Sequence, residues 1–365
     1  MVLGVRGIPN VAGGVETHAE QLYRQLAALG CQVEVIVRTP FVAKQHKSFG
    51  PIRLRRIWAP RRPGLEAFVH SVLGVLYAGL TRPEILHIHA VGPAIVTPIA
   101  RLLGLRVVVT HHGPDYDRDK WGGFARFVLR TGERMGMRYS HARIVISKVI
   151  QTLVESKYAR DSTLIPNGVL VAEPRVETNH VERYGLEPGR YCLQVSRIVP
   201  EKRQLDLIRA FALAKPTGWK LALVGGLGGT TYSNEVEAAA KNTDNVVLTG
   251  FLSGEPLAQL YSHAGLFVLP SSHEGLAIAA LEALSYGLPV LASDIGANLE
   301  IGLDPSCYFP VGDVARLAER LLASSRVKET QEVRRARRQW VEKHYDWTAI
   351  AEQTLEVYQR VVKRT

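Results

Sequence analysis

Short apolar runs rich in β-branched residues alternate with longer amphipathic stretches along the first half of the chain. The apolar runs are 2–6, 33–37, 85–89, 106–110 and 144–147. The stretches between them, beginning with 16–29, have helical periodicity. This alternation predicts βαβ units, and strands that are apolar on both faces, such as 107–109, are typical of a parallel sheet covered by helices.

A second series of the same kind follows after a break. Its apolar runs are 191–196, 220–225, 245–249, 266–269 and 289–292. Between the two series lie 165–169 and the polar, strand-poor stretch 173–189. We therefore predict two Rossmann-like, doubly wound α/β domains, residues 1–175 and 176–345, with a ligand in a cleft where the carboxyl ends of both sheets face each other. Residues 346–365 predict a final amphipathic helix.

Composition narrows the class of protein. The 365 residues are 46% hydrophobic and 22% charged, which excludes disordered and fibrous proteins. Cys31, Cys192 and Cys307 have no CxxC spacing and predict core thiols in a reducing, cytoplasmic compartment. The early strand predicts that no signal peptide is present. The apolar stretch 67–80 is shorter than the ~20 residues of a bilayer span and predicts a buried helix.

The positive charge is concentrated in the first half. Of the net charge of +11, residues 1–175 contribute +12 (24 Lys and Arg against 12 Asp and Glu) and the remainder −1 (21 against 22). The first half is therefore expected to meet an anionic partner, unless it is merely a solvated basic face.

Three loops carry candidate binding chemistry. The first, at 6–16, places Gly13 and Gly14 before a predicted helix, where backbone N–H groups and the helix dipole favour a phosphate. It matches neither GxGxxG nor the P-loop pattern, and an ordinary turn is the alternative. The second follows the run 191–196, where Arg197 and Lys202 could converge on a diphosphate.

The third loop is the most informative. Glu274 and Glu282 are eight residues apart, on a loop and on the helix that follows it. Both can face one crevice, with helix N–H groups between them. Carboxylates beside an anion site suit the hydroxyls and diphosphate of a sugar nucleotide. A solvated helix face is the alternative for Glu282, although its neighbours are apolar.

Together and in this order, these motifs resemble the retaining family 4 glycosyltransferases of GT-B fold, over essentially the whole chain. The matching segments are 13–16, the strand-ending 110–113, 165–169, 196–202, 270–282 and 289–294. The chain departs from the family pattern at Leu170, Leu276, Ala277 and Ala297, and a Cβ at Ala277 could narrow access for a phosphate.

The resemblance implies a role for each matching residue. Arg197 and Lys202 would bind the donor diphosphate and stabilise the leaving nucleotide, with Gly13 and Gly14 at the same phosphates. Glu282 would accept hydrogen bonds from the ribose, and Glu274 from the transferred sugar. The further donor-site positions are Gly275, Leu276 and Ala277, and His112 would lie near the sugar or acceptor as a catalytic residue.

The segment 112–122 is rich in the residue types that bind carbohydrate. Asp115, Tyr116 and Trp121 predict an acceptor subsite, together with His89 at the end of a strand. The strings 115–117 and 117–119 also fit DxD, and histidines 87, 89, 111 and 112 could imitate a metal cluster. We predict no metal site, a cleft-lining His89 and a structural His87.

Five arginines and a tryptophan lie close together in the first half: Arg53, Arg55, Arg56, Trp58, Arg61 and Arg62. Nucleic acid is one possible partner, but no nucleic-acid-binding motif accompanies them. An anionic membrane surface fits better, with Arg on headgroups and Trp at the interface. A solvated loop is the remaining alternative.

These observations predict a metal-independent, retaining glycosyltransferase without a cofactor, peripheral on the cytoplasmic membrane. It would move a sugar from a nucleoside diphosphate to a lipid-linked glycan in bacterial surface polysaccharide or lipopolysaccharide assembly, with some resemblance to rhamnosyltransferases. A sugar-nucleotide epimerase or phosphorylase on the same fold is one alternative. A non-catalytic basic protein that binds membrane or nucleic acid is another.

Overall fold

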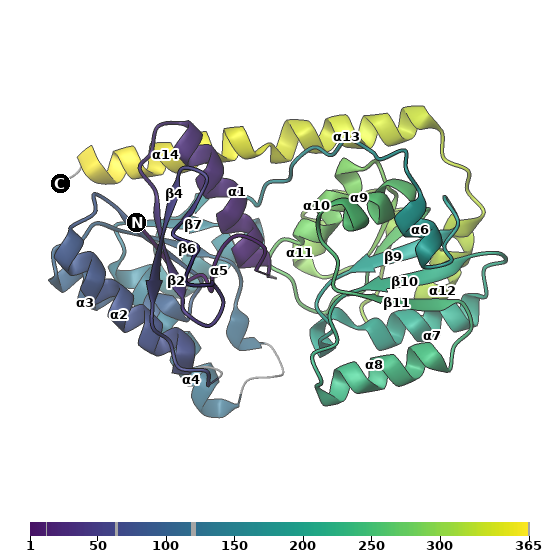
Figure 1. Ribbon diagram of the computed structural model, residues 1–365, viewed down its shortest axis with the longest axis horizontal. Coiled ribbons are helices and arrows are strands. Elements are labelled where there is room, and N and C mark those ends of the chain that lie inside the picture. Colours follow the sequence, from purple (N-terminus) through teal and green to yellow (C-terminus); the bar gives the residue numbers. More distant parts are fainter. Residues whose placement is uncertain (12, 63–64, 118–121, 364–365) are drawn as a thin grey trace. The chain divides into compact units, whose positions relative to one another are not determined.

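The computed structural model describes residues 1–11, 13–62, 65–117 and 122–363. It divides into two compact units (Figure 1). Unit 1 is Met1–Gly168 with Trp347–Thr365, and unit 2 is Val169–Asp346. The first boundary therefore lies seven residues before position 175, and the chain returns to unit 1 for its last helix. Two doubly wound, mainly parallel α/β units confirm the predicted fold class.

Unit 1 is built on an eight-stranded sheet of order β3-β4-β2-β1-β5-β6-β7-β8, parallel except for β3 against β4. Its strands are β1 (Val2–Leu3), β2 (Glu34–Arg38), β3 (Ser48–Phe49), β4 (Ile52–Ile57), β5 (Leu86–His89), β6 (Val107–His111), β7 (Ala142–Val145) and β8 (Thr163–Leu164). Every residue of β5 and β6 is buried, as expected for central strands covered on both faces.

Helices cover both faces of this sheet (Figure 1). They are α1 (Gly14–Ala28), α2 (Leu65–Thr81), η1 (Pro93–Val96), α3 (Thr97–Leu102), η2 (Asp115–Asp117), α4 (Gly123–Tyr139), α5 (Lys148–Tyr158) and α14 (Trp347–Lys363). The side chains of α1 and α14 share one core with the strands, centred on Leu22, Trp347 and Val357. On the other side, α3 contacts both α2 and α4.

The predicted buried helix at 67–80 forms as α2, but it is not buried. Its outer face exposes Leu65, Phe68, Leu73, Leu76 and Leu80. The residues that it buries are His70, Ser71, Gly74, Val75 and Ala78. The prediction of burial was wrong because it rested on the overall apolar character of the stretch, whereas the side that packs inward is the one with His70, Ser71 and Gly74. None of the described helices is long and apolar enough to cross a bilayer.

Unit 2 has a six-stranded parallel sheet of order β11-β10-β9-β12-β13-β14. Its strands are β9 (Tyr191–Val195), β10 (Lys220–Val224), β11 (Val246–Gly250), β12 (Leu266–Leu269), β13 (Val290–Ser293) and β14 (Tyr308–Phe309). The helices are α6 (Asn179–Arg183), η3 (Pro200–Lys202), α7 (Gln204–Ala214), α8 (Thr231–Lys241), α9 (Gly254–His263), α10 (Ile278–Ser285), α11 (Gly296–Leu299), η4 (Pro305–Cys307), α12 (Val314–Ser325) and α13 (Gln331–Tyr345).

Both sheets reverse strand order at their first strand in the sequence. In unit 2, β9 lies between β10 and β12, and in unit 1, β1 lies between β2 and β5. Ligands of doubly wound sheets bind outside the carboxyl ends of the strands at such a switch point. The loops that follow β9 and β12, and those that follow β1 and β5, are therefore where a site is expected.

Candidate functional site

The switch point of unit 2 brings together two side chains that lie far apart in the sequence. Lys202 is in η3, beyond the end of β9, and Glu274 is on the loop after β12. The Lys202 ammonium donates a hydrogen bond to Glu274 Oε1, and both side chains are mostly buried. Arg197 lies on the same loop as Lys202, more exposed, with its guanidinium 4.0 Å from Glu201. A partly desolvated cation pair beside a carboxylate is an arrangement that can exchange its internal partner for a phosphate.

Two buried glutamines hold the Arg197–Lys202 loop in place. Gln194 donates a hydrogen bond to the Lys202 carbonyl at 2.9 Å, and Gln204 donates to the Arg197 carbonyl at 2.8 Å. The loop after β12 is joined to it, because the Ser272 N–H donates to the Glu201 carbonyl at 2.9 Å. The sequence analysis did not identify these glutamines, whose only signal is an amide inside an apolar strand and at a helix start.

The start of α10 accommodates two of the four residues at which the chain departs from the family pattern. Leu276 and Ala277 are buried, and Ala277 is the N-cap residue of α10 with φ −75° and ψ 98°. This conformation is open to any L-residue, so the backbone does not require glycine there. Gly275, Leu276 and Ala277 thus lead directly from Glu274 into the helix that carries Glu282.

Glu282 has a partner that the sequence did not predict. Its Oε2 accepts a hydrogen bond from the Tyr261 hydroxyl at 2.9 Å. Burial raises the pKa of Glu282 to about 7, although the Tyr261 hydrogen bond opposes the shift. A carboxyl group that has a pKa near 7 and accepts one hydrogen bond from the protein keeps its other lone pairs for a ligand hydroxyl.

The raised pKa of Glu282 predicts how the stability of unit 2 depends on pH. An ordinary glutamate ionises near pH 4.5 in the unfolded chain, whereas native Glu282 retains its proton up to about pH 7. The resulting stabilisation is full below pH 4.5 and is lost as the pH rises through 7. Glu282→Gln is therefore expected to stabilise unit 2 more at pH 8 than at pH 5, by up to about 3 kcal/mol.

Scanning calorimetry of the unit 2 transition between pH 4.5 and 8 checks this. The exposed Glu235 on α8 gives a matched control, because Glu235→Gln should leave the pH profile unchanged. An unaltered profile in Glu282→Gln would contradict the expectation.

In unit 1, the glycine loop wraps an ion pair. The Arg6 guanidinium donates to both carboxylate oxygens of Glu16, at 2.9 and 3.1 Å. Gly13 has φ +151°, and a Cβ there would lie 2.1 Å from Glu16 Oε2, so the loop needs glycine at this point. Gly14 is exposed and faces open space. The N-terminus of α1 is thus bare of side chains at its first residue, as an approaching anion requires.

A chain of buried imidazole and phenol groups backs His112. His112 follows β6, and its Nε2 lies 2.9 Å from His89 Nδ1. His89 Nε2 contacts the Tyr23 hydroxyl at 2.5 Å, and the same hydroxyl lies 2.9 Å from His87. His87 is satisfied by Thr110 as well, which agrees with a structural role. His89 is fully buried and therefore does not line a cleft; it contacts His112 instead.

His18, a residue that the sequence analysis missed, completes a group of three. The ring nitrogens of His18, His89 and His112 lie within 4.8 Å of one another. The His89 and His112 ring centroids are 5.2 Å apart, and His89 Nδ1 and His112 Nε2 are in hydrogen-bond contact. These two nitrogens therefore point at each other and not at a shared ion. Burial, and then the neighbouring histidines, lower the pKa of His112 well below its ordinary value, so it is neutral at neutral pH.

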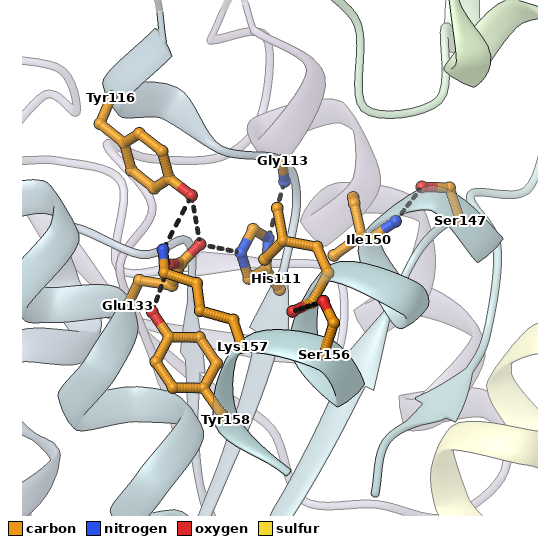
Figure 2. Close-up of polar contacts among 10 residues, drawn as sticks. His111, Gly113, Tyr116, Glu133, Ser147, Ile150, Ser156, Lys157 and Tyr158 are labelled. Carbon is orange, nitrogen blue, oxygen red and sulfur yellow. Dashed lines mark hydrogen bonds and ion pairs between the residues drawn. The ribbon is translucent and has the colours of Figure 1, made fainter. Parts of the chain in front are cut away.

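The adjacent histidine, His111, points into a second network, shown in Figure 2. Its Nε2 donates to the buried Glu133 of α4 at 2.8 Å, and its Nδ1 accepts from the Gly113 N–H at 3.1 Å. These two bonds fix its tautomer and hold the residues on both sides of His112. The different partners of these two consecutive histidines could not be predicted from the sequence.

Glu133 is the centre of that network. Besides His111, it accepts hydrogen bonds from the Tyr116 hydroxyl at 3.0 Å, from Lys157 at 2.5 Å and from the Tyr158 hydroxyl. Burial alone would raise its pKa, but the hydrogen bonds from His111, Lys157 and Tyr158 outweigh burial and lower the pKa to about 2. Glu133 is therefore an ionised buried carboxylate that ties α4, α5 and the loop after β6 together.

The predicted acceptor residues fall into different environments. Tyr116 in η2 is buried and its hydroxyl is used by Glu133, so its ring supports the loop. Asp115 is half-buried and Asp117 is exposed on the same short helix. Trp121, with 118–120, lies outside the described residues.

The amino acid sequence matches two family models in tandem. Residues 12–173 match the model for glycosyltransferase family 4, and residues 177–356 match that for glycosyl transferases group 1. The chain belongs to the group 1 glycosyltransferases of family 4. Its relatives include a 2-deoxystreptamine N-acetyl-D-glucosaminyltransferase of Streptomyces fradiae, 26% identical over 344 residues that cover 84% of this chain and 81% of the relative.

Solved structures of low identity share the fold of this glycosyltransferase. A sucrose-phosphate synthase from Thermosynechococcus elongatus superimposes with a TM-score of 0.85 at 22% identity, over 100% of this chain and 99% of the other. HepE of Anabaena, solved with UDP and glucose, gives a TM-score of 0.79 at 19% identity, over 98% of each chain. Both likenesses support the GT-B fold.

The arginine-rich segment of the glycosyltransferase does not form a single surface. On β4, Arg53 and Arg55 lie on one face of the sheet and Arg56 lies on the other. The Arg55 guanidinium is 3.4 Å from the Glu34 carboxylate and lies over the Tyr77 ring. Trp58 is 60% exposed, and it lines a hollow of about 810 Å³ together with Arg56, Arg61 and Arg62. The predicted cluster is thus divided between a sheet face and this hollow.

Proposed function

We propose that this glycosyltransferase transfers a sugar from a nucleoside diphosphate to a glycan acceptor, with retention of anomeric configuration and without a metal ion. The observation that carries the proposal is the contact between Lys202 and Glu274 at the switch point of unit 2, with Arg197 on the same loop. This is where a doubly wound fold binds nucleotides, and it supplies two cations for a diphosphate.

The chemistry follows from where charge develops. As the glycosidic bond to the diphosphate breaks, the sugar becomes oxocarbenium-like and negative charge grows on the departing phosphate. Lys202 and Arg197 stabilise that charge, and fixed cations in a partly desolvated site do so more strongly than water. Glu274 neutralises Lys202 before the donor arrives and then accepts a sugar hydroxyl. The acceptor hydroxyl gives its proton to the departing phosphate.

The remaining residues of the proposed site bind and orient. Glu282 accepts hydrogen bonds from the ribose hydroxyls, with Gly275, Leu276 and Ala277 presenting backbone N–H groups to the phosphates. In unit 1, Gly13 and Gly14 leave the N-terminus of α1 accessible to a phosphate. Neutral His112 offers one ring nitrogen to the transferred sugar or to the acceptor, and Asp115 lies on the acceptor side.

A lipid-linked glycan is the proposed acceptor, in assembly of a bacterial surface polysaccharide such as lipopolysaccharide. The excess positive charge of residues 1–175 supports an anionic membrane surface beside the acceptor. Trp58, Arg61 and Arg62 are exposed and would contact such a membrane surface. Rhamnose as the transferred sugar stays a prediction from the sequence.

A thermal-shift panel of UDP, GDP, ADP, dTDP and CDP tests the donor site, with and without EDTA, on the wild type and Glu282→Ala. A nucleotide at ~100 times its Kd adds roughly 2.7 kcal/mol. We expect one nucleotide to raise the melting temperature by several degrees, independently of EDTA and less in Glu282→Ala. If none of the five stabilises the protein, the donor site is wrong and a non-catalytic basic protein becomes the better interpretation.

A further inference from the structure

The helix α2 has the reverse of the amphipathic pattern expected on a protein surface. Its residues are spaced so that Leu65, Phe68, Leu73, Leu76 and Leu80 share one side, and all five are exposed, Leu80 by 85%. The opposite side packs inward with His70, Ser71, Gly74, Val75 and Ala78. A Cβ on Gly74 would lie 2.5 Å from Leu3, so the close packing of this inner side depends on its small size.

The neighbouring helix α4 exposes a face of a different kind. Phe124 and Phe127 at its start are 82% and 67% exposed, and Arg130, Arg134 and Arg138 follow. At 100° per residue these five side chains fall within about a third of the helix circumference. They therefore form one stripe, aromatic at one end and basic along the rest.

Helix α3 lies between the two and continues the apolar surface. It contacts both α2 and α4, and its Leu102 is 88% exposed beside the exposed Arg101. Figure 1 shows α2, α3 and α4 gathered on one side of unit 1. We call the outer surface of these three helices the α2–α4 face.

Within α2 and α4 no acidic side chain is free to oppose this positive charge. Glu66 of α2 is paired with Arg38 at 2.9 Å. Glu133 of α4 is fully buried in the network described above. Exposed apolar side chains accompanied by arginine on the same helices are complementary to a surface with an apolar interior and anionic headgroups.

We propose that the α2–α4 face is an interfacial membrane-docking surface for an anionic lipid bilayer. The leucines and phenylalanines enter the boundary between headgroups and acyl chains, and the three arginines of α4 contact lipid phosphates. This inference rests on the proposed function, because a lipid-linked acceptor lies in a membrane that the enzyme would have to approach. In the sequence, α4 directly follows the proposed acceptor segment 112–122.

The test is sedimentation of the full chain with vesicles of 70% phosphatidylcholine and 30% phosphatidylglycerol, against pure phosphatidylcholine. We expect binding to the anionic vesicles to be at least tenfold stronger and to weaken between 0.1 and 0.5 M NaCl. The variants Leu76→Gln/Leu80→Gln and Phe124→Ser/Phe127→Ser should each lower it at least tenfold. Replacing Arg130, Arg134 and Arg138 by Gln should remove the preference for anionic lipid.

Leu213→Gln/Phe251→Ser is the matched control, because these side chains of unit 2 are 61% and 57% exposed. It should bind vesicles like the wild type. The proposal is overturned if the wild type ignores anionic vesicles or if the control loses as much binding as the α2 and α4 variants. It is also overturned if light scattering shows a dimer that Leu76→Gln/Leu80→Gln dissociates with vesicle binding intact, since a second copy would then occupy the face.

Nucleotide stabilisation measured on the same variants separates this inference from the proposed function. Variants that lose vesicles but keep the nucleotide shift are folded and defective only at the face. Vesicle binding without any nucleotide shift would leave the docking surface standing and remove the donor site.

Discussion

Replacing Lys202 by methionine is expected to lower the rate of sugar transfer by about 10²–10³-fold, with a much smaller effect on stability. Removing one preorganised group that stabilises developing charge costs a factor of that order in other enzymes. Methionine keeps the length of the side chain and removes the ammonium. Lys202→Arg should restore little, because a planar guanidinium does not replace a point charge packed against Glu274.

The measurement is turnover of the nucleotide sugar identified by the nucleotide panel, with kcat and KM separated. The loss should appear mainly in kcat, since the charge is larger in the transition state than in the bound donor. Lys241 is the matched control, because it also pairs with a glutamate, Glu237 at 2.8 Å, but on an exposed helix. If Lys241→Met and Lys202→Met transfer sugar equally fast, Lys202 has no part in catalysis.

Replacing Glu133 by leucine should destabilise unit 1 by about 3–5 kcal/mol, the usual cost of removing one partner from a buried ion pair. Four donors, from His111, Tyr116, Lys157 and Tyr158, would lose their acceptor together. In calorimetry the unit 1 transition should fall by roughly 10 °C and the unit 2 transition should stay in place.

Glu133→Gln keeps the shape of the side chain and should cost less than leucine. The exposed Glu155 of α5 serves as control, since Glu155→Gln removes a carboxylate that is not buried. Equal displacement of both transitions, or of neither, would show that Glu133 is not the centre of unit 1 stability.

The same carboxylate sets an acid limit. The pKa of Glu133 is lowered to about 2 from an ordinary 4.5, so its contribution to stability is full above pH 4.5 and is lost as the pH falls through 2. Glu282 acts in the opposite direction, because its raised pKa makes its contribution disappear toward alkaline pH. The free energy of unfolding should therefore fall in acid for unit 1, and toward alkaline pH for unit 2.

The sequence by itself determined the central strands of both sheets and the loops that carry the chemistry, but it did not predict β3, β4, β8 and β14. Strand and helix periodicities differ, so runs such as 107–109 and 266–269 could be recognised without a structure. Candidate side chains lay just beyond strands, and the carboxyl ends of neighbouring parallel strands meet at one edge. Lys202 and Glu274, which 72 residues separate, could therefore be assigned to one donor site, although their direct contact was not predicted.

Tertiary structure alone decided the partners and the directions of side chains. Tyr261 meets Glu282, and Glu133 gathers four donors, through contacts between elements whose mutual rotation no local pattern encodes. The outward face of α2 was undetermined for a related reason. The side that α2 buries is the one that fits closely against the sheet, with Gly74 and Ala78, although its leucines lie on the other side; Leu76 and Leu80 are therefore left outside.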